Sequence, residues 1–105
     1  MTQGTGAAMS STGLHEDPSQ LRLETVDRHR AIVSLMEEFE AIDWYGQRID
    51  AATDDELRQI LTHNRDEEKE HAAMVLEWLR RHDPELDRHL RTYLFTEGNI
   101  TQLEH

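Results

Sequence analysis

The sequence has 105 residues, which is at most one modest domain, and its 22 acidic against 11 basic side chains give a net charge of −11. A chain this acidic repels nucleic acid and anionic membrane surfaces, so we expect neither as a partner, and it concentrates cations nearby. The absence of cysteine excludes disulfides, thiolate zinc sites and a cysteine nucleophile. No apolar run approaches the roughly 18 residues of a membrane span, and the N-terminus has no signal-peptide core. Together these features predict a soluble, cytoplasmic protein.

The first part of the chain predicts an arm followed by a long helix. Residues 1–16 are small, polar and aperiodic, which is typical of disorder. Asp17 precedes Pro18, and Gln20 follows three residues after Asp17, a pattern that indicates a helix start. From 21 to about 49 there is no proline and a single glycine, so we expect one long helix there.

A second long helix follows a short break. The stretch DAAT, residues 50–53, interrupts the helical pattern. Thr53 and Glu56 then have the spacing of a capping box, which predicts a helix start at this point. We expect this helix to run to about His82.

The C-terminal part predicts a third, shorter helix and a tail. Asp83-Pro84 ends the second helix and begins the third, which we expect to end near Gly98. Residues 99–105 form the predicted tail, and its last three residues, Leu-Glu-His, resemble the start of a vector-encoded histidine tag, so we expect a truncated C-terminus. No segment has the pattern of a strand.

The predicted fold is all-α, with residues 17–98 as one helical half-bundle. The short connection forces the two long helices, each roughly 45 Å long, into an antiparallel hairpin. Two helices cannot enclose a core, because each keeps one apolar side open. We therefore expect two chains to associate across a two-fold axis into a four-helix bundle.

Polar residues that interrupt the apolar seam of the first long helix carry the functional prediction. The alternating three- and four-residue steps of a packed seam select Ala31, Leu35, Glu38, Ile42, Tyr45 and Ile49. Every member is apolar or aromatic except Glu38. Its neighbours Glu37 and Glu40 lie about 100° and 200° around the helix, so both leave this seam.

The second long helix has a seam with more polar members. The same steps select Leu57, Leu61, Asn64, Glu68, His71, Val75 and Trp78. Asn64, Glu68 and His71 interrupt it. Most of the acidic segment DEEKEHAAM, residues 66–74, therefore belongs to a solvated face, but Glu68 and His71 belong to the predicted buried side.

These inward acids predict a metal site. A buried carboxylate without a counter-charge costs several kcal/mol, and neither seam contains a lysine or arginine. In Glu68-x-x-His71 the two side chains share a helix face and can reach one ion. A carboxylate-bridged di-iron site in a four-helix bundle takes one Glu from each of two helices and one Glu-x-x-His from each of the other two. With Glu38, one chain supplies half of that set, so the unfinished core and the unfinished site both predict a symmetric dimer.

Three segments closely resemble the encapsulated ferritins, and the similarity covers about residues 20 to 101. They are HRAIVSLMEEFEAIDWYGQRIDA, HNRDEEKEHAAMVLEWLRR and LRTYLFTEG. The resemblance implies a ferritin-like four-helix-bundle dimer, dimers assembled into a ring-shaped decamer, and a ferroxidase site across the dimer interface. It also implies that the protein is cargo inside an encapsulin shell that stores the oxidised iron. The family's encapsulation peptide lies at the C-terminus, and no such peptide is visible in this sequence.

The resemblance also assigns roles to individual positions. The iron ligands correspond to Glu38, Glu68 and His71. The tyrosine beside the site corresponds to Tyr45. The residues proposed to line a route by which metal enters correspond to Glu37, Glu40 and Trp44.

Several positions have a simpler interpretation as well. Tyr45 fits an ordinary core position as well as a hydrogen bond to a ligand carboxylate, and the outer acids fit a solvated face as well as a site that attracts Fe(II). A row at i, i+4 and i+7 could bind a second, weaker surface metal: His63, Glu67 and Glu70. The remaining large side chains are most simply packing groups, with the third helix serving subunit contacts: Trp78, Leu79, Tyr93, Leu94 and Phe95.

The predicted function is ferroxidation, with two Fe(II) ions per dimer bridged by the paired Glu68 carboxylates and further held by Glu38 and His71. Hard carboxylates with one imidazole per metal suit iron and stabilise Fe(III). A di-iron oxygenase or a dimanganese catalase could use the same ligands, whereas a hemerythrin-like oxygen carrier would need more histidines. The rival from another class is a structural helical oligomer whose metals only link its chains.

Overall fold

The computed structural model describes residues 13–104. Within this range the chain forms three α-helices and two one-turn 3₁₀ helices, Pro18–Gln20 and Ile100–Leu103, and no strand. The all-helical prediction is confirmed. Residues 1–12 of the predicted disordered arm and His105 of the predicted tail lie outside the described residues.

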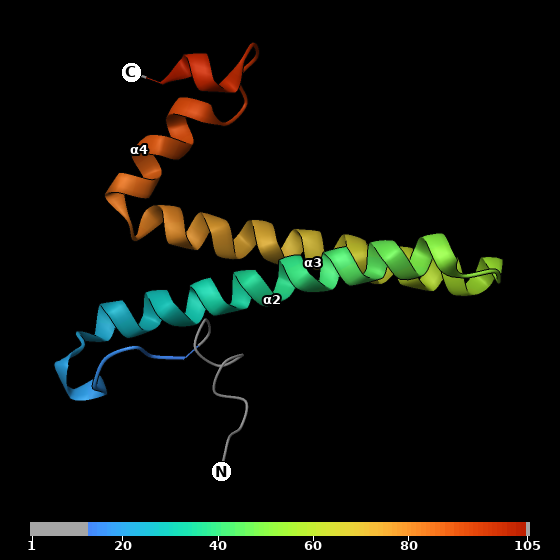
Figure 1. The fold of residues 1–105 in the computed structure, drawn as a ribbon, viewed down its shortest axis with the longest axis horizontal. Helices are drawn as coiled ribbons and strands as arrows, with labels where there is room; N and C mark the ends of the chain where they lie inside the picture. Colours follow the sequence, from blue (N-terminus) through green and yellow to red (C-terminus); the bar gives the residue numbers. More distant parts are fainter. Residues whose placement is uncertain (1–12, 105) are drawn as a thin grey trace.

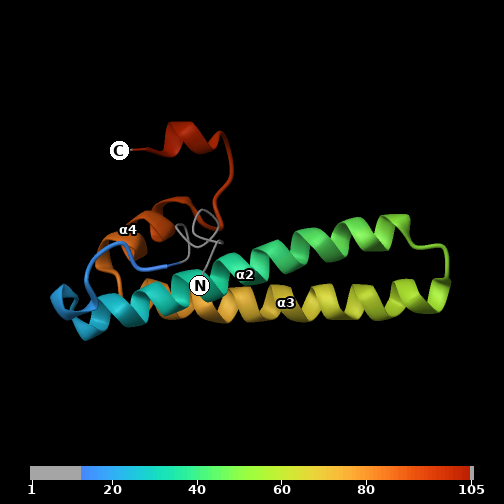
Figure 2. The ribbon, with the colours of Figure 1, turned by 60° about the horizontal axis from the view of Figure 1, so that its bottom comes forward.

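The two long helices form the predicted antiparallel hairpin. Helix α2 spans Leu23–Ala51 and α3 spans Asp55–Arg81, and the two lie side by side along most of their length (Figures 1 and 2). At 1.5 Å per residue they are about 40–44 Å long. Only three residues connect them, so the chain must reverse its direction at once and α3 returns along α2.

The start of α2 differs from the prediction. Asp17 caps only the 3₁₀ turn, because its Oδ1 atom accepts hydrogen bonds from the backbone N–H and the hydroxyl of Ser19, both at 2.9 Å. Leu21 and Arg22 are then extended, and α2 begins at Leu23. Asp17 is therefore a helix cap followed by proline, as predicted, but of a one-turn 3₁₀ helix that does not continue into the long helix.

The N-terminus of α3 also lies one residue beyond the predicted cap. The Oδ2 atom of Asp54 accepts a hydrogen bond of 2.9 Å from the backbone N–H of Leu57, so Asp54 and not Thr53 is the cap. Asp and Thr are both good caps, and the charged carboxylate is the stronger acceptor at the positive end of a helix dipole.

Helix α4, Pro84–Tyr93, begins as predicted and ends early. Asp83 caps it by accepting a hydrogen bond of 3.0 Å from the backbone N–H of Leu86. The predicted end near Gly98 was wrong. The helix ends at Tyr93, because Leu94 is extended and Phe95 has a left-handed backbone with φ of 60°. The backbone N–H of Leu94 donates the last capping hydrogen bond to the carbonyl of Leu90.

The chain alone has almost no core. Among the described residues only Ala72 and Leu79 are buried. Helix α4 packs on α3 but not on α2, and the chain measures 51 × 49 × 21 Å, so it is a flat layer with few interior positions. Such an unfinished core is what a chain that associates with a second copy requires; the association itself stays a prediction. No helix in the described part of the chain is long and apolar enough to cross a membrane.

The predicted seams are correct on α2 and partly wrong on α3. Every predicted seam residue of α2 is half-buried. On α3, four of the seven predicted residues are half-buried, and the two buried residues, Ala72 and Leu79, lie beside the predicted line. The four are Leu61, Asn64, Glu68 and Val75. Leu57, His71 and Trp78 are exposed, because a pair of helices covers only the centre of each seam and leaves its edge open.

Candidate metal centre

The centre of the hairpin contains a buried carboxylate oxygen with no partner. Glu38 lies in the middle of α2 on the side that faces α3. Its Oε1 atom is the one buried side-chain oxygen or nitrogen within residues 13–104 that has no hydrogen-bond partner. Most buried polar atoms in proteins are hydrogen-bonded, and one that is not carries a free-energy cost of about 1–3 kcal/mol. The described part of the chain supplies no partner for this oxygen, so the oxygen is available to a group from outside the chain.

The electrostatic environment of Glu38 agrees with that interpretation. Burial raises the pKa of its carboxyl, and the negative charges of Glu68 and Glu37 raise it further, while the charge of His71 acts in the opposite direction. Each raising effect disfavours the ionised carboxylate. A cation at this position would reverse these effects by neutralising the carboxylates.

The second part of the site is a carboxylate–imidazole pair on α3. The Nδ1 atom of His71 lies 3.1 Å from Oε1 of Glu68. The side chains are 45% and 27% exposed, respectively, so the pair lies at the edge of the hairpin and not in a closed interior. When Nδ1 carries the proton and donates it to the carboxylate, Nε2 keeps a lone pair that can bind a metal.

Glu68 and His71 lie close enough to Glu38 for their charges to affect the pKa of its carboxyl; that the three side chains bind one metal stays a prediction. Yet no group of three or more carboxylate or imidazole side chains within residues 13–104 is arranged to hold a metal ion. His71 is exposed in the single chain, and its burial in a bundle of two chains stays a prediction. One chain thus presents one buried donor, Glu38, and two donors at an open edge, and completion of the ligand set by a second chain stays a prediction.

Tyr45 is half-buried on α2, as expected for a seam position. The guanidinium carbon of Arg48 lies 5.4 Å from the centre of its ring, which is a cation–π distance. No hydrogen bond from Tyr45 to a carboxylate is formed within the described chain. The structure therefore supports a packing contact for this ring, and its role beside the metal stays a prediction.

The outer acidic face of α2 is exposed, as predicted. Glu37 and Glu40 are both exposed, and the indole of Trp44 is 49% exposed. Glu37 lies close enough to Glu38 for its charge to raise the pKa of that carboxyl. This face can therefore attract cations towards Glu38, and its role as a route for iron stays a prediction.

The predicted secondary site is only partly assembled. The Nε2 atom of His63 lies 3.5 Å from Oε1 of Glu67, and both side chains are more than half exposed. Glu70 instead lines a separate open groove beside Trp78 and His82. Two of the three predicted ligands therefore lie together, and a surface metal at this row stays a prediction.

Sequence reasoning missed the corner between α3 and α4. Arg80 forms ion pairs with Glu77 on its own helix and with Asp87 on α4, and so joins the two helices. Phe95, interpreted as a packing group, is fully exposed. The i, i+3 spacing of Glu77 and Arg80 was visible in the sequence, but the partner across the helix break was not.

Comparison with known proteins agrees with the helical architecture and identifies the family. A family model described as EncFtn-like matches residues 13–97. The chain is 68% identical over 97 residues to an encapsulated ferritin-like protein of Rhodospirillum rubrum, covering 92% of this chain and 69% of that protein. It is 56% identical over 90 residues to a ferritin-like protein of Thermotoga maritima, covering 86% and 79% of the two chains.

A more distant relative and a solved structure extend this picture. A Myxococcus xanthus protein named encapsulin nanocompartment cargo protein EncC is 39% identical over 59 residues, covering 56% of this chain and 45% of that protein. The crystal structure of protein ne0167 from Nitrosomonas europaea superposes with a TM-score of 0.81 at 59% identity, covering 84% of this chain and 97% of that one. The matched family model and the 68% identical relative each cover most of this chain, which therefore belongs to the EncFtn-like family.

Proposed function

We propose that this protein is a ferroxidase that oxidises Fe(II) to Fe(III) with dioxygen at a di-iron site shared between two chains. The observation that supports this most directly is the buried Oε1 atom of Glu38, which has no partner and lies beside the Glu68–His71 pair. A divalent cation satisfies such an oxygen and compensates the charge of the neighbouring carboxylates at the same time.

The ligand set fits iron as the substrate. Two copies of Glu38, Glu68 and His71 supply four carboxylates and two imidazoles, and four negative charges balance two divalent cations. Hard carboxylate oxygens stabilise Fe(III) more than Fe(II), which favours loss of an electron at each iron. Two ions held about 3.5–4 Å apart can together give two electrons to one dioxygen molecule. In this proposal the two Glu68 carboxylates would be shared by the two irons, and each iron would be held further by one Glu38 and one His71.

Storage of the product requires a partner. An open groove of about 600 Å³ lies near the C-terminal end, and the chain is a layer only 21 Å thick, so neither encloses a volume for mineral. Relatives are named as encapsulated and as cargo of an encapsulin nanocompartment. We infer the same association for this chain: it passes oxidised iron to the interior of an encapsulin shell, and its dimers form a ring such as the decamer that the resemblance implies.

Oxygen uptake after addition of Fe(II) tests the proposal. The wild-type protein should consume dioxygen rapidly with the appearance of ferric absorbance, and Glu68→Ala should lose both. Asp66→Ala is the matched control, because Asp66 lies two residues earlier on α3, is exposed and pairs only with Arg65. Equal activity of Glu68→Ala and the control would contradict the ligand assignment.

The alternative is a structural oligomer whose metals link its chains without catalysis. The exposed position of His71 at the edge of the hairpin fits that role equally well. Metal-dependent association without oxygen uptake would establish this alternative and exclude a ferroxidase.

A further inference from the structure

An open groove runs along the outer edge of α3 beside the candidate metal centre. Its volume is about 480 Å³, and its lining includes Met74, Trp78 and His82, so it is here named the methionine groove. These three residues follow one another at four-residue steps and therefore form a row along one face of α3 and its C-terminal cap. His71 lies three residues before Met74, and side chains at this spacing are neighbours, with roughly 5–6 Å between their Cβ atoms. The groove thus begins one helical turn from a proposed iron ligand.

The row consists of side chains that peroxide can oxidise. The imidazole of His82 stacks on the indole of Trp78, with 3.9 Å between the ring centroids and 17° between the planes. Its Nδ1 atom also lies 2.8 Å from the backbone carbonyl oxygen of Trp78. Met74 precedes this stacked pair and is more exposed than the indole, at 59% against 36%. Its thioether is soft and polarisable and forms a sulfoxide, so it is the member of the row best placed to react first.

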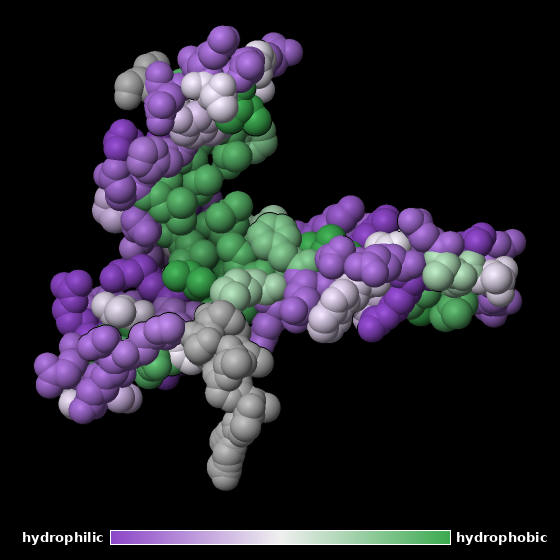
Figure 3. All heavy atoms as spheres, in the orientation of Figure 1, coloured by the Kyte–Doolittle hydropathy of each residue, from purple (hydrophilic) through white to green (hydrophobic). Residues whose placement is uncertain are grey.

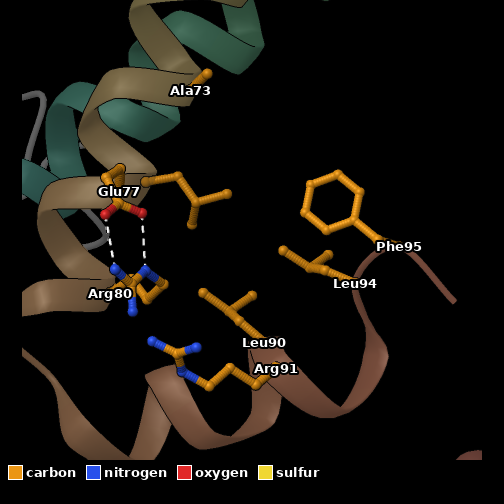
Figure 4. A pocket seen from close by; sticks show the side chains of 8 residues that line it. Ala73, Glu77, Arg80, Leu90, Arg91, Leu94 and Phe95 are labelled. Atoms are coloured by element: carbon orange, nitrogen blue, oxygen red, sulfur yellow. Dashed lines mark hydrogen bonds and ion pairs between the residues drawn. The ribbon is translucent and has the colours of Figure 1, made fainter.

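A second groove, on the side of α3 that carries α4, has a different lining. It has a volume of about 600 Å³ and shares Ala73 and Glu77 with the methionine groove. Figure 4 shows Leu90 and the ion pair of Glu77 and Arg80 at this corner, and in the space-filling view apolar side chains gather there (Figure 3). None of the residues that line this second groove carries sulfur, an indole or an imidazole. The easily oxidised side chains therefore lie on the side of α3 that carries His71.

The proposed reaction produces an oxidant beside the methionine groove. Two Fe(II) ions give two electrons to one dioxygen molecule, which takes up two protons and becomes hydrogen peroxide. Hydrogen peroxide is small and uncharged, so the acidic surface of the chain neither attracts nor repels it. The side chain of His71 is 45% exposed at the edge of the hairpin. Peroxide that leaves the centre across this edge therefore reaches Met74 within one helical turn.

We propose that Met74 consumes hydrogen peroxide released by the metal centre and thereby protects His71 and Trp78 from oxidation. This inference rests on the proposed ferroxidase function. The O–O bond of peroxide breaks, one oxygen atom bonds to the sulfur of Met74, and the other leaves as water with both protons. The sulfur loses two electrons and peroxide gains them, so the step needs no further reactant. Methionine sulfoxide is a substrate of sulfoxide reductases, so the thioether can be restored and used again.

Met36 on α2 provides an internal control. It is 40% exposed, so its sulfur is nearly as accessible as that of Met74. It lies two residues before Glu38, which is about 200° around the helix at 100° per residue, and therefore on the far side of α2 from the metal centre. Met36 and Met74 thus differ mainly in their position relative to the site where peroxide is produced.

The experiment follows both methionines by mass spectrometry of peptides. Added hydrogen peroxide, without iron, should oxidise Met74 and Met36 in the ratio of their exposed fractions, 59% to 40%, or about 1.5. During repeated additions of Fe(II) in air, Met74 should become sulfoxide at least about fivefold faster than Met36, because peroxide formed one turn away has a higher local concentration. Catalase in solution should remove the oxidation of Met36 and leave most of that of Met74.

Met74→Leu is the test variant, because leucine keeps a similar apolar volume without the sulfur. It should oxidise Fe(II) at the wild-type rate, while oxidised His71 and Trp78 accumulate several-fold faster than in wild type. Met36→Leu is the matched control and should change neither the rate of iron oxidation nor the damage to these two residues.

Three results would overturn the proposal: a ratio of Met74 to Met36 oxidation that iron turnover leaves at the value found with added peroxide, loss of Met74 oxidation when catalase is present, or unchanged damage to His71 and Trp78 in Met74→Leu. Oxygen uptake is measured in the same samples, so each of these results leaves the ferroxidase intact. A wild-type protein that takes up no oxygen would instead overturn the proposed function, and this inference with it.

Discussion

Two clusters of charged side chains on α3 differ in how completely the chain compensates them. In the middle of the helix, Glu68 and His71 lie beside Glu38 of α2, whose buried oxygen has no partner. At the C-terminal end, Glu77 and Asp87 are each held by arginines, with Arg80 paired to both. The chain leaves the charges of the first cluster partly uncompensated, whereas arginines of the same chain compensate the charges of the second.

The pKa values of two glutamates express the same difference. Burial, together with neighbouring carboxylates, raises the pKa of Glu38, whereas hydrogen bonds from Arg80 and Arg81 lower the pKa of Glu77 to about 2. The same side chain is thus disfavoured as an anion in one place and strongly favoured in the other. Compensated charges hold α4 against α3, and the uncompensated ones are available to bind a metal.

The largest expected effect follows from removing the uncompensated carboxylate. Glu38→Ala should lower the rate of iron oxidation at least about 100-fold, because each iron loses a ligand. Stopped-flow measurement of the ferric absorbance checks this. Asp43→Ala is the control on α2, since Asp43 is exposed and its one side-chain hydrogen bond within residues 13–104 comes from Gln47; a similar loss in both variants would show that Glu38 has no special role.

Metal removal should have the next largest effect. In the proposed site a metal completes the central cluster, and a ligand at 100 times its dissociation constant adds about 2.7 kcal/mol to the stability of the bound protein. Adding Zn²⁺ or anaerobic Fe(II) to chelator-treated protein should raise its Tm and its molar mass, and excess chelator should reverse both. Glu38→Ala should show a much smaller rise. An unchanged Tm for wild type would show that no metal binds the folded chain, and an equal rise in Glu38→Ala would place the metal elsewhere.

Replacing Glu38 should stabilise the metal-free chain even though it abolishes activity. The folded-state pKa of Glu38 is raised above its ordinary 4.5, so the cost of ionising it is absent below pH 4.5 and grows as the pH rises through the folded pKa. Glu38→Leu should therefore gain about 1–3 kcal/mol at neutral pH. Urea unfolding near pH 7 and near pH 4 measures this; a gain that is larger at the acidic pH would contradict it.

Acid should weaken the ion pairs of Glu77, whereas it removes the cost of ionising Glu38. The pKa of Glu77 is lowered to about 2, so its contribution to stability is complete above the ordinary value of 4.5 and is lost as the pH falls towards 2. Hydrogen exchange of α4 should rise over that window in wild type. Glu77→Gln should remove this pH dependence and exchange faster at neutral pH; an unchanged profile would show that the ion pairs do not hold α4.

The smallest effect is expected on the outer face of α2. Glu40→Gln should lower the oxidation rate a few-fold at low Fe(II) and leave it unchanged at saturation, because an exposed acid only raises the local cation concentration. Repeating the assay at high salt should remove the difference. A loss at saturating iron would instead make Glu40 a ligand.

The fold was largely predictable because its signals are local. The Asp83-Pro84 cap and the short connection near Thr53 fix the helix order and the hairpin, and an acid in an apolar seam identifies Glu38. The open edge at His71 was not predictable, because periodicity gives the direction of a side chain but not how far its neighbour covers it. The left-handed backbone of Phe95 was equally hidden, since glycine and asparagine are the residues that usually signal it.

The bridge between Arg80 and Asp87 could not be predicted either. The two residues lie seven positions apart across a break in the helix, so their contact depends on the angle between α3 and α4 and not on sequence spacing. The sequence therefore predicts the cluster around Glu38 better than the ion pairs of Arg80. An acid in an apolar seam is unusual, because charged side chains are rarely buried without a partner. An acid paired with an arginine resembles any surface charge in the sequence.

An anaerobic Fe(II) titration with light scattering, followed by exposure to air, tests the central claim most directly. The shared di-iron site predicts saturation near one iron per chain, a rise from the chain mass of 12.3 kDa to at least twice that value, and rapid ferric absorbance once oxygen is admitted. Iron bound to monomers, or associated chains that hold Fe(II) in air without oxidising it, would contradict a ferroxidase site built from two copies of Glu38, Glu68 and His71.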